Sequence, residues 1–281
     1  GGRGKEYVPA DVNPVADPKL LSISRSQDGK LDPRPAADSP AFTGTLSETA
    51  DGFWTPVGYK GAFDANDNWA YGWTGLSANG FFPARDNVVN VDAHYLYGTH
   101  NWSATNVYIL KGFTYVMSNA VLNIEAGTVV KGASGTGTST NAANDFGCLF
   151  VCAGGKLNAN GTPNRPIIFT AVADDVSDSG DLPFPTRGLW GGIVLFGNAR
   201  LNNPGWTTNN VSYDIYEGLP DLAVTNAVSG QVDYLHRYGG SNDDDSSGSM
   251  RYVSVRHGGK KLTTDKEING WSLCGVGRGT V

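Results

Sequence analysis

The chain lacks three features that mark common protein classes: long hydrophobic runs, helical periodicity and clustered basic charge. No segment has about eighteen or more consecutive apolar residues, which excludes an ordinary membrane-spanning helix. Apolar residues do not recur at helical spacing over three turns, so little α-helix is expected. The formal net charge is −6 and the basic residues are scattered, which argues against nucleic acid as a partner.

Cysteine is also scarce, with three residues at Cys148, Cys152 and Cys274. They form neither a disulfide framework nor a metal-binding CxxC pair. Cys148 and Cys152 lie on one face of a predicted strand at roughly 13 Å from each other, which is too far for a disulfide. Two alternatives stay open: a bond from either residue to Cys274 between stacked coils, or three small buried side chains.

Familiar catalytic motifs are absent from the sequence as well. It has no GxSxG nucleophile elbow, no HExxH zinc motif and no GxxxxGK[ST] phosphate loop. Its four histidines are not paired at metal-ligand spacing; they are His94, His100, His236 and His257. The sequence therefore predicts a protein that is not an enzyme.

Glycine is abundant, with 38 residues, and a short phrase recurs with its glycine in register. The copies span Ile124–Val130, Val151–Leu157 and Val194–Leu201. Each copy predicts a strand, a bend at glycine and a second strand. Gly127 and Gly154 are 27 residues apart, which suits one unit of a solenoid that buries its apolar face only against its neighbours.

Strand pairing in such a solenoid decides the fold class. Hairpin signals are weak, and equivalent strands return only after a full coil, which requires parallel pairing. The predicted fold is an all-β parallel β-helix, with polar inserts near residues 133–146, 172–187, 202–248 and 259–267 as loops. Buried aliphatic ladders are expected to contain Ile124, Val129, Val151, Leu157, Ile168, Val194 and Leu273.

Three regions are predicted along the chain. Residues 1–50 form an extended proline-rich arm, residues 51–104 an aromatic-rich cap or docking segment, and residues 105–281 the parallel β-helix. Exposed aromatic rings stack on sugars, but they also plug open coil ends and pack between protomers. The candidate ligand or interface residues of the aromatic segment are Trp54, Tyr59, Trp69, Tyr71 and Trp73.

Several phrases together resemble a known family, in the same order along the chain. They include Asn106–Gly112, Leu122–Gly132, Gly154–Thr170, Gly188–Ala199, Tyr238–Asp245 and Met250–Gly259. They are similar to secreted bacterial surface proteins with a right-handed parallel β-helix of pectin-lyase-like shape, which are mostly functionally uncharacterised. The resemblance covers about residues 104–281. It implies a right-handed coil and an extracellular or cell-surface location, and it implies no catalytic residues.

The two ends of the sequence depart from this family. A phrase like Asp17–Leu20 followed by Leu31–Ala37 usually comes after the β-helix, whereas here it comes before. The segment Gly277–Val281 falls in the expected middle of a coil, so an open coil end is expected. Such an end aggregates, is capped, or stacks onto another copy. Head-to-tail contact that does not close generates a filament.

A short acidic run is the candidate metal site. Asp243, Asp244 and Asp245 offer hard oxygen ligands of the kind that Ca²⁺ prefers, although the spacing is not that of an EF-hand. A solvated turn is the alternative, and no other cofactor is expected. Basic residues follow between Arg251 and Lys261, and β-helix polysaccharide lyases combine calcium-bound uronate with an Arg or Lys base, so lyase chemistry would lie here.

Glycosylation is a further possibility that the sequence raises. Three N-x-S/T sequons lie in or near predicted loops, beginning at Asn101, Asn160 and Asn210. In a bacterial protein most such matches arise by chance, whereas surface filaments can carry glycans.

The sequence as a whole predicts an extracellular structural protein that associates head to tail with copies of itself into a filament or tandem array. The N-terminal arm and aromatic segment of one copy would engage the open coil of the next. A surface carbohydrate-binding module is the alternative, and a calcium-dependent polysaccharide lyase is the second alternative. The expected partners are copies of the chain itself or, under these alternatives, a polysaccharide.

Overall fold

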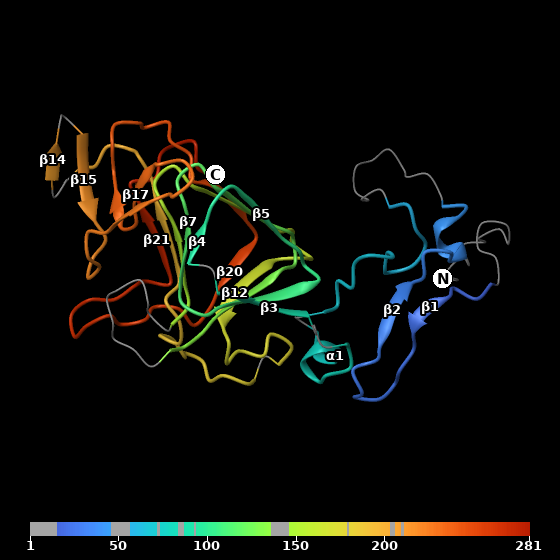
Figure 1. Cartoon of the computed structure of the whole chain (residues 1–281). Helices are drawn as coiled ribbons and strands as arrows, with labels where there is room; N and C mark the ends of the chain where they lie inside the picture. The colour runs from blue at the N-terminus through green and yellow to red at the C-terminus, as the bar shows by residue number, and fades with distance from the viewer. Residues whose placement is uncertain are drawn as a thin grey trace, which may run out of the picture. The chain divides into compact units, whose positions relative to one another are not determined.

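The computed structural model describes residues 16–45, 57–71, 74–83, 87–92, 94–135, 146–178, 180–202, 206–208 and 211–281. The chain divides into two compact units (Figure 1). The small unit comprises residues 1–84 with 176–179, and the large unit comprises residues 85–175 with 180–281. No helix in the described residues is both long and apolar enough to cross a membrane.

The small unit joins the predicted arm to the predicted aromatic segment. Its elements are β1 (Leu20–Ser22), β2 (Asp32–Pro35), the 3-10 helix η1 (Pro40–Phe42) and α1 (Gly75–Ala78). Strands β1 and β2 pair antiparallel, so this part of the arm is not simply extended. The backbone N–H groups of Gly29 and Leu31 donate to the carbonyls of Gly80 and Phe81 at 3.0 and 2.9 Å. The arm and the aromatic segment therefore belong to one unit.

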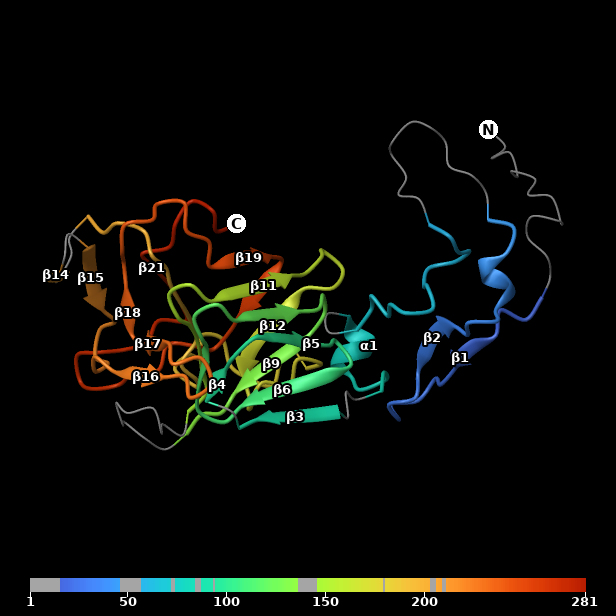
Figure 2. The ribbon, with the colours of Figure 1, turned by 45° about the horizontal axis from the view of Figure 1, so that its top comes forward.

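The large unit is mainly a coil of the backbone, and its successive turns build three parallel sheets (Figure 2). Sheet I contains β3 (Asn87–Val91), β6 (Asn106–Leu110), β9 (Val129–Gly132), β12 (Ile167–Ala171) and β20 (Val253–Val255). Sheet II contains β4 (Tyr95–Leu96), β7 (Phe113–Val116), β10 (Cys148–Val151), β13 (Ile193–Phe196) and β21 (Trp271–Cys274). Sheet III contains β5 (Thr99–Trp102), β8 (Val121–Ile124), β11 (Lys156–Asn160) and β19 (Gly248–Arg251).

The chain visits sheets I, II and III in turn and then starts the next coil. All neighbouring strands in these sheets pair in parallel, which confirms the predicted all-β parallel β-helix solenoid. The first coil is β3, β4 and β5, and Asn87 of β3 lies opposite Asn106 of β6. The coil therefore begins before residue 105, the predicted boundary. Its first turn lies in the region predicted as the aromatic segment.

Alternate residues of each strand face the coil interior and the outside. In sheet III, Leu122 and Leu157 are fully buried and lie opposite each other in the core. Outside, Asn123 donates to Asn101 and Asn158 donates to Asn123, each at 2.9 Å. The amide row thus satisfies polar groups along the outer face, while the leucines fill the interior.

The bends of the coil depend on glycine. Gly127 and Gly154, the glycines of the repeated phrase, have φ of +87° and +86°, a region that L side chains avoid. Gly248 at the start of β19 has φ of +114°, and a Cβ there would lie 2.0 Å from the carbonyl oxygen of Leu157. Only glycine allows β19 to pair this closely with β11.

A long insert between β13 and β19 carries the remaining short strands. They are β14 (Trp206–Thr208), β15 (Val211–Ile215), β16 (Ala223–Thr225), β17 (Val232–Tyr234) and β18 (Arg237–Tyr238), and their pairs are antiparallel. The insert covers the outer face of sheet II. There the rings of Tyr115 and Phe150 stack at 5.0 Å, and those of Phe196 and Tyr238 stack at 6.1 Å.

The predicted aliphatic ladders are confirmed for all but the last residue. Six of the seven residues are buried: Ile124, Val129, Val151, Leu157, Ile168 and Val194. The prediction is wrong for Leu273, whose side chain is 57% exposed. Its strand, β21, is the last of sheet II, so the interior column that contains Leu273 has no further strand above it.

Truncating the core should destabilise the coil far more than truncating its surface. We expect Leu157→Ala to lower the free energy of unfolding by about 2–5 kcal/mol, because it leaves a cavity between β8 and β19. Val228→Ala is the matched control, since Val228 is 97% exposed on the insert. Denaturant titration followed by circular dichroism measures both, and equal effects would contradict the assignment of Leu157 to the core.

Candidate functional site

The last coil leaves apolar interior residues open to solvent at one end of the β-helix. Trp271 and Leu273 of β21 lie opposite Ile193 and Leu195 of β13, which are buried. Trp271 is 37% exposed and Leu273 is 57% exposed. Ser272 between them faces outward, where its Oγ lies 2.8 Å from the hydroxyl of Tyr216 in the insert. The alternation therefore assigns Trp271 and Leu273 to the coil interior.

In β21, the backbone N–H and C=O groups of alternate residues point away from β13. Ile193 donates its N–H to Gly270 and Gly197 donates to Cys274, so residues 270, 272 and 274 pair with β13. Parallel pairing then directs the N–H and C=O groups of Trp271 and Leu273 away from β13. A strand edge of this kind is a template for another strand.

Sheet III ends differently, because the last residues of the chain pair with β19. Met250 donates its N–H to the carbonyl of Val281 at 2.7 Å, and Val281 donates to Gly248 at 3.1 Å. These two bonds have the geometry of a parallel strand. The fifth coil therefore has a segment in each of the three sheets: β20, β21 and the backbone at Val281.

At the other end of the coil, β3 is the outermost strand of sheet I. Its residues Val88 and Val89 are among the large hydrophobic side chains that are exposed, Val88 at 52%. Lys111 donates its N–H to Val91 at 3.5 Å, which places residues 87, 89 and 91 toward β6 and leaves Val88 and Asn90 facing the open edge. Among the described residues, the two outermost strands of sheet I, β3 and β20, each pair with a strand on one side only.

The carboxylates of the acidic run, the predicted calcium ligands, each contact another group of the chain. Asp243 accepts from the guanidinium and then the backbone N–H of Arg200, and these bonds lower the pKa of Asp243 to about 2. Asp244 pairs with Arg278, and Asp245 accepts from the backbone and side-chain amides of Asn198 at 3.0 and 3.3 Å. Each carboxylate is directed to a different donor. In the described part of the chain, no group of three His, Cys, Asp or Glu side chains is placed to hold a metal ion.

A second polar cluster lies where β12, β20 and the 172–187 insert meet. Asp174 is buried and its carboxylate accepts from the hydroxyl of Thr170. Arg256 Nη1 lies 4.0 Å and His257 Nε2 lies 3.9 Å from the same Asp174 oxygen. Lys131 donates to the backbone carbonyl of Asp174 at 2.7 Å. The sequence predicted a basic stretch from Arg251 to Lys261 but placed Asp174 in a loop, since Arg256 and His257 lie 82 and 83 residues from Asp174 along the chain.

The ring of His257 is held in one orientation. Its Nδ1 lies 2.8 Å from the carbonyl oxygen of Thr186, so Nδ1 carries a proton and donates. In the neutral ring this leaves the Nε2 lone pair directed toward Asp174. His257 also has a φ of +55°, which is uncommon for a residue other than glycine. Such local strain is found most often at sites with a function.

The predicted aromatic ligand residues contribute to packing of the small unit where they are described. Trp69 stacks on Phe63 with ring centroids 5.3 Å apart, and its Nε1 donates to Ala62 at 2.7 Å. Tyr71 lies 6.3 Å from Phe82. Tyr59 is half-buried, while Trp54 and Trp73 lie outside the described residues.

Two of the three predicted glycosylation sequons lie on the coil. Asn101 and Asn160 are exposed on sheet III, and Asn210 lies outside the described residues.

The cysteines are free thiols, so no bond to Cys274 forms. Burial raises the pKa of Cys148 and Cys152, and it raises the pKa of Cys274 to about 12. The thiols are therefore protonated packing groups at neutral pH.

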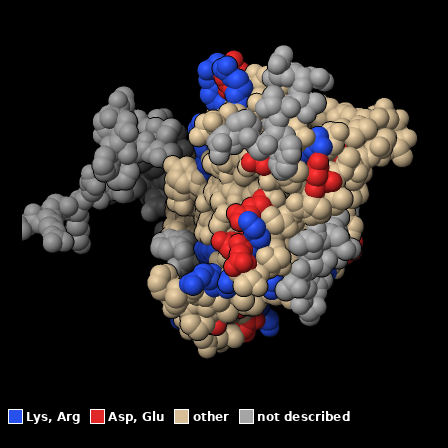
Figure 3. Space-filling view, turned by 90° about the vertical axis from the view of Figure 1, so that its left-hand side faces the viewer, with Lys and Arg blue, Asp and Glu red and all other residues tan. Residues whose placement is uncertain are grey.

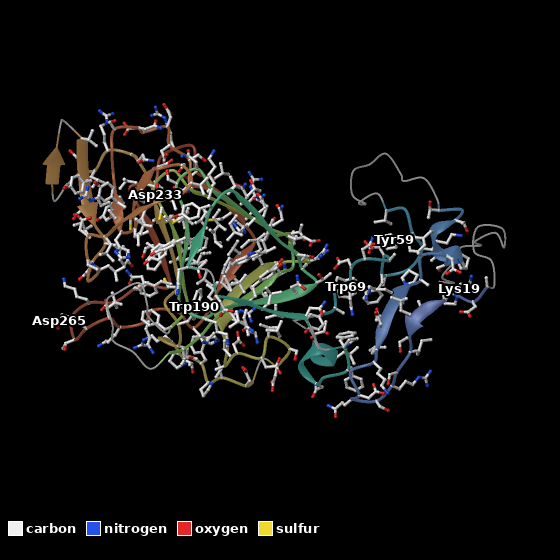
Figure 4. The ribbon with its side chains drawn as sticks, in the orientation of Figure 1. Lys19, Tyr59, Trp69, Trp190, Asp233 and Asp265 are labelled. Carbon is white, nitrogen blue, oxygen red and sulfur yellow. The ribbon has the colours of Figure 1, made fainter. Side chains whose placement is uncertain are left out.

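The insert is attached to sheet II by a buried hydrogen-bonded pair. Tyr115 Oη lies 2.8 Å from His236 Nε2, and His236 Nδ1 lies 2.6 Å from the carbonyl of Pro220. Asp233, labelled in Figure 4, is also buried in this insert and accepts from Gln231 at 3.0 Å.

On the face of the molecule drawn in Figure 3, acidic and basic groups lie close together and no large area has one sign.

Parallel coils with open edges define the chain as a β-helix solenoid. The family model described as "Pectate-lyase like beta helix domain" matches residues 96–281. The chain therefore belongs to the pectate-lyase-like β-helix domain family, as the resemblance of its phrases indicated. No curated protein and no solved structure matches it.

The buried His236 should make the stability of the large unit depend on pH. Burial lowers the pKa of His236 in the fold, whereas in the unfolded chain it titrates near 6.5. Its contribution is therefore complete above about pH 6.5 and is lost as the pH falls, because the unfolded chain then binds the extra proton.

We expect the free energy of unfolding to fall between pH 7 and pH 5, and His236→Gln to flatten this dependence. His100→Gln, on sheet III, is the control and should leave the slope unchanged. Urea titrations at several pH values measure the free energy of unfolding. An unaltered pH dependence in His236→Gln would refute the role of His236.

Proposed function

We propose that the protein is a non-enzymatic structural β-helix of the cell surface or extracellular space, which associates head to tail with copies of itself. The observation that carries this proposal is the exposure of Trp271 and Leu273, interior side chains of β21, which is the outermost strand of sheet II in the described residues. In the described residues, β3 is likewise the outermost strand of sheet I. A second copy would extend these sheets by strand pairing, without a change of fold.

The energetics favour another coil as the occupant of this end. Burying a leucine side chain contributes about 1.5–3 kcal/mol, and a half-exposed one recovers roughly half of that. Backbone N–H and C=O groups on the open edge gain partners from another strand. Another β-helix coil supplies both kinds of contact at once.

The aromatic segment is less suited to be the joint than the strand edges. Trp69 and Tyr71 are in contact with Phe63 and Phe82 within the small unit. Their large apolar area is thus already used in part, which also argues against a carbohydrate-binding module built on these rings. The end strands, in contrast, have open backbone groups.

A lysine at the exposed interior position should weaken association. Leu273→Lys places a charge where the next coil would bury an apolar side chain, so we expect at least a tenfold weaker self-association, since tenfold corresponds to about 1.4 kcal/mol. Val228→Lys adds the same charge at an exposed site on the insert and should leave association unchanged. Light scattering across a concentration series and negative-stain microscopy measure both. Monomeric wild type at high concentration would overturn the proposal.

A second candidate function, cleavage of an acidic polysaccharide, is favoured by the cluster at Asp174. In this scheme Arg256 binds the uronate carboxylate, and His257 Nε2 removes the proton α to it. The C–H electrons form a C=C bond, the bond to the leaving sugar oxygen breaks, and water protonates that oxygen. The bond from Nδ1 to the carbonyl of Thr186 leaves Nε2 as the ring nitrogen that can accept the proton. Calcium dependence has no support from the Asp243–Asp245 run, because these carboxylates have other partners.

This second candidate has a direct test in the absorbance of the unsaturated product. If it is right, the protein releases that product from polygalacturonate or alginate with or without a chelator, and His257→Gln lowers the rate at least a hundredfold. Lys156→Gln, on the outer face of sheet III, is the control with full activity. Absence of product from the wild type would remove the candidate for these substrates and leave the structural role in place.

A further inference from the structure

We infer that Asn269 is a site of spontaneous deamidation, in which its side-chain amide becomes a carboxylate after attack by the backbone nitrogen of Gly270. The sequence has three Asn-Gly pairs, which begin at Asn79, Asn160 and Asn269. Glycine after asparagine favours this reaction, because glycine has no Cβ to obstruct the approach of its nitrogen to the side chain. The hydrogen bonds of the fold distinguish the third pair from the other two.

The reaction is a ring closure followed by hydrolysis. The nitrogen of Gly270 forms a bond to Cγ of Asn269, the bond from Cγ to Nδ2 breaks, and ammonia leaves with the proton of the Gly270 N–H. Water then opens the succinimide ring at either carbonyl and leaves aspartate or isoaspartate. The ring closes only if the backbone N–H and the side-chain amide are both free to meet.

In the first pair, both reacting groups are held at the end of α1. Nδ2 of Asn79 donates to the carbonyl of Gly75 at 2.6 Å. The N–H of Gly80 donates to the carbonyl of Ser77 at 3.0 Å. Ring closure at Asn79 would have to break both bonds.

The second pair is held in the same way at the end of β11. Oδ1 of Asn160 accepts from the hydroxyl of Ser249 at 2.8 Å, and the N–H of Gly161 donates to the carbonyl of Arg251 at 2.8 Å. The backbone is also crowded here, since a Cβ on Gly161 would lie 2.6 Å from the carbonyl oxygen of Tyr252. Ring closure at Asn160 is therefore opposed by bonding and by packing.

Asn269 has neither restraint. It lies outside any strand or helix, between the loop of residues 259–267 and β21. Neither its side-chain amide nor the N–H of Gly270 forms a hydrogen bond with another residue that the structure describes. The asparagines of all three pairs are exposed, so hydrogen bonding rather than access to water separates them.

The free N–H of Gly270 has a local cause in the fold. The carbonyl of Gly270 accepts from the N–H of Ile193 at 3.1 Å, and a regular parallel ladder would pair the N–H of Gly270 with the carbonyl of Gly191. That carbonyl instead accepts from the N–H of Gly259 at 3.0 Å. The loop of residues 259–267 thus takes the acceptor that would otherwise protect Gly270.

Peptide mapping of the full chain by mass spectrometry tests the inference. After incubation of the folded protein at mildly alkaline pH, we expect Asn269 to deamidate at least tenfold faster than Asn79 and Asn160, a difference of about 1.4 kcal/mol in activation free energy. An isoaspartate-specific methyltransferase should label the peptide that contains residue 269. In the chain unfolded by urea, the three rates should converge to within a few-fold, because the hydrogen bonds are then absent.

Gly270→Ala should slow the reaction at Asn269 at least tenfold, because the methyl group obstructs ring closure. The methyl group fits the fold, since its nearest neighbour would be the Cα of Gly258 at 4.0 Å, and circular dichroism verifies that the variant is folded. Gly58→Ala is the matched control, because a Cβ there meets nothing within 4 Å, and it should leave the rate at Asn269 unchanged.

Three outcomes would overturn the inference. The first is a rate at Asn269 in the folded wild type that is no faster than the rates at Asn79 and Asn160, a comparison that needs no variant. The second is a difference between the sites that persists in urea, since its cause would then lie in the local sequence. The third is a folded Gly270→Ala variant in which Asn269 deamidates as fast as in the wild type.

Discussion

Parallel backbone hydrogen bonding between successive coils is the interaction on which the rest of this structure depends. Each coil supplies one strand to each sheet, and the register is kept from β3 to β20 in sheet I and from β4 to β21 in sheet II. The fixed register stacks like side chains into columns, so the core is filled by repetition rather than by a unique set of contacts. It also means that the outermost strands of the described coil, β3, β4, β20 and β21, pair with another strand of their sheet on one side only.

Buried aspartates attach the inserts to this scaffold. Asp174 lies at the start of the 172–187 insert, Asp233 lies within the 197–247 insert and Asp245 lies at its return to β19; all three are buried. Asp174 and Asp245 accept hydrogen bonds from groups at the ends of the coil strands β12 and β13, namely Thr170 and Asn198. A buried acid that lost such a partner would be costly, which fixes where each insert meets the coil. The coil can thus carry long polar inserts without losing its register.

The sequence was informative about the coil and much less so about its sites. Recurring glycines, such as Gly127 and Gly154, mark the bends because their positive φ excludes other residues, so the repeat could be recognised directly. The predicted start of the coil is too late because β4 has only two residues and many aromatic residues precede β3. The acidic run at Asp243 suggested calcium, since charge is visible in a sequence, whereas the arginines that neutralise it, Arg200 and Arg278, are distant along the chain.

The sequence by itself determined the all-β solenoid, its parallel pairing and the absence of familiar catalytic motifs, because these follow from glycine spacing, strand-length runs and local residue types. Tertiary structure alone decided that Leu273 is exposed rather than buried, that Asp174 meets Arg256 and His257, and that Val281 pairs with β19 in sheet III. The physical reason is the same in each case. These contacts join residues one or more coils apart, and the length of each insert, which sets which residues meet, leaves no periodic signal in the sequence.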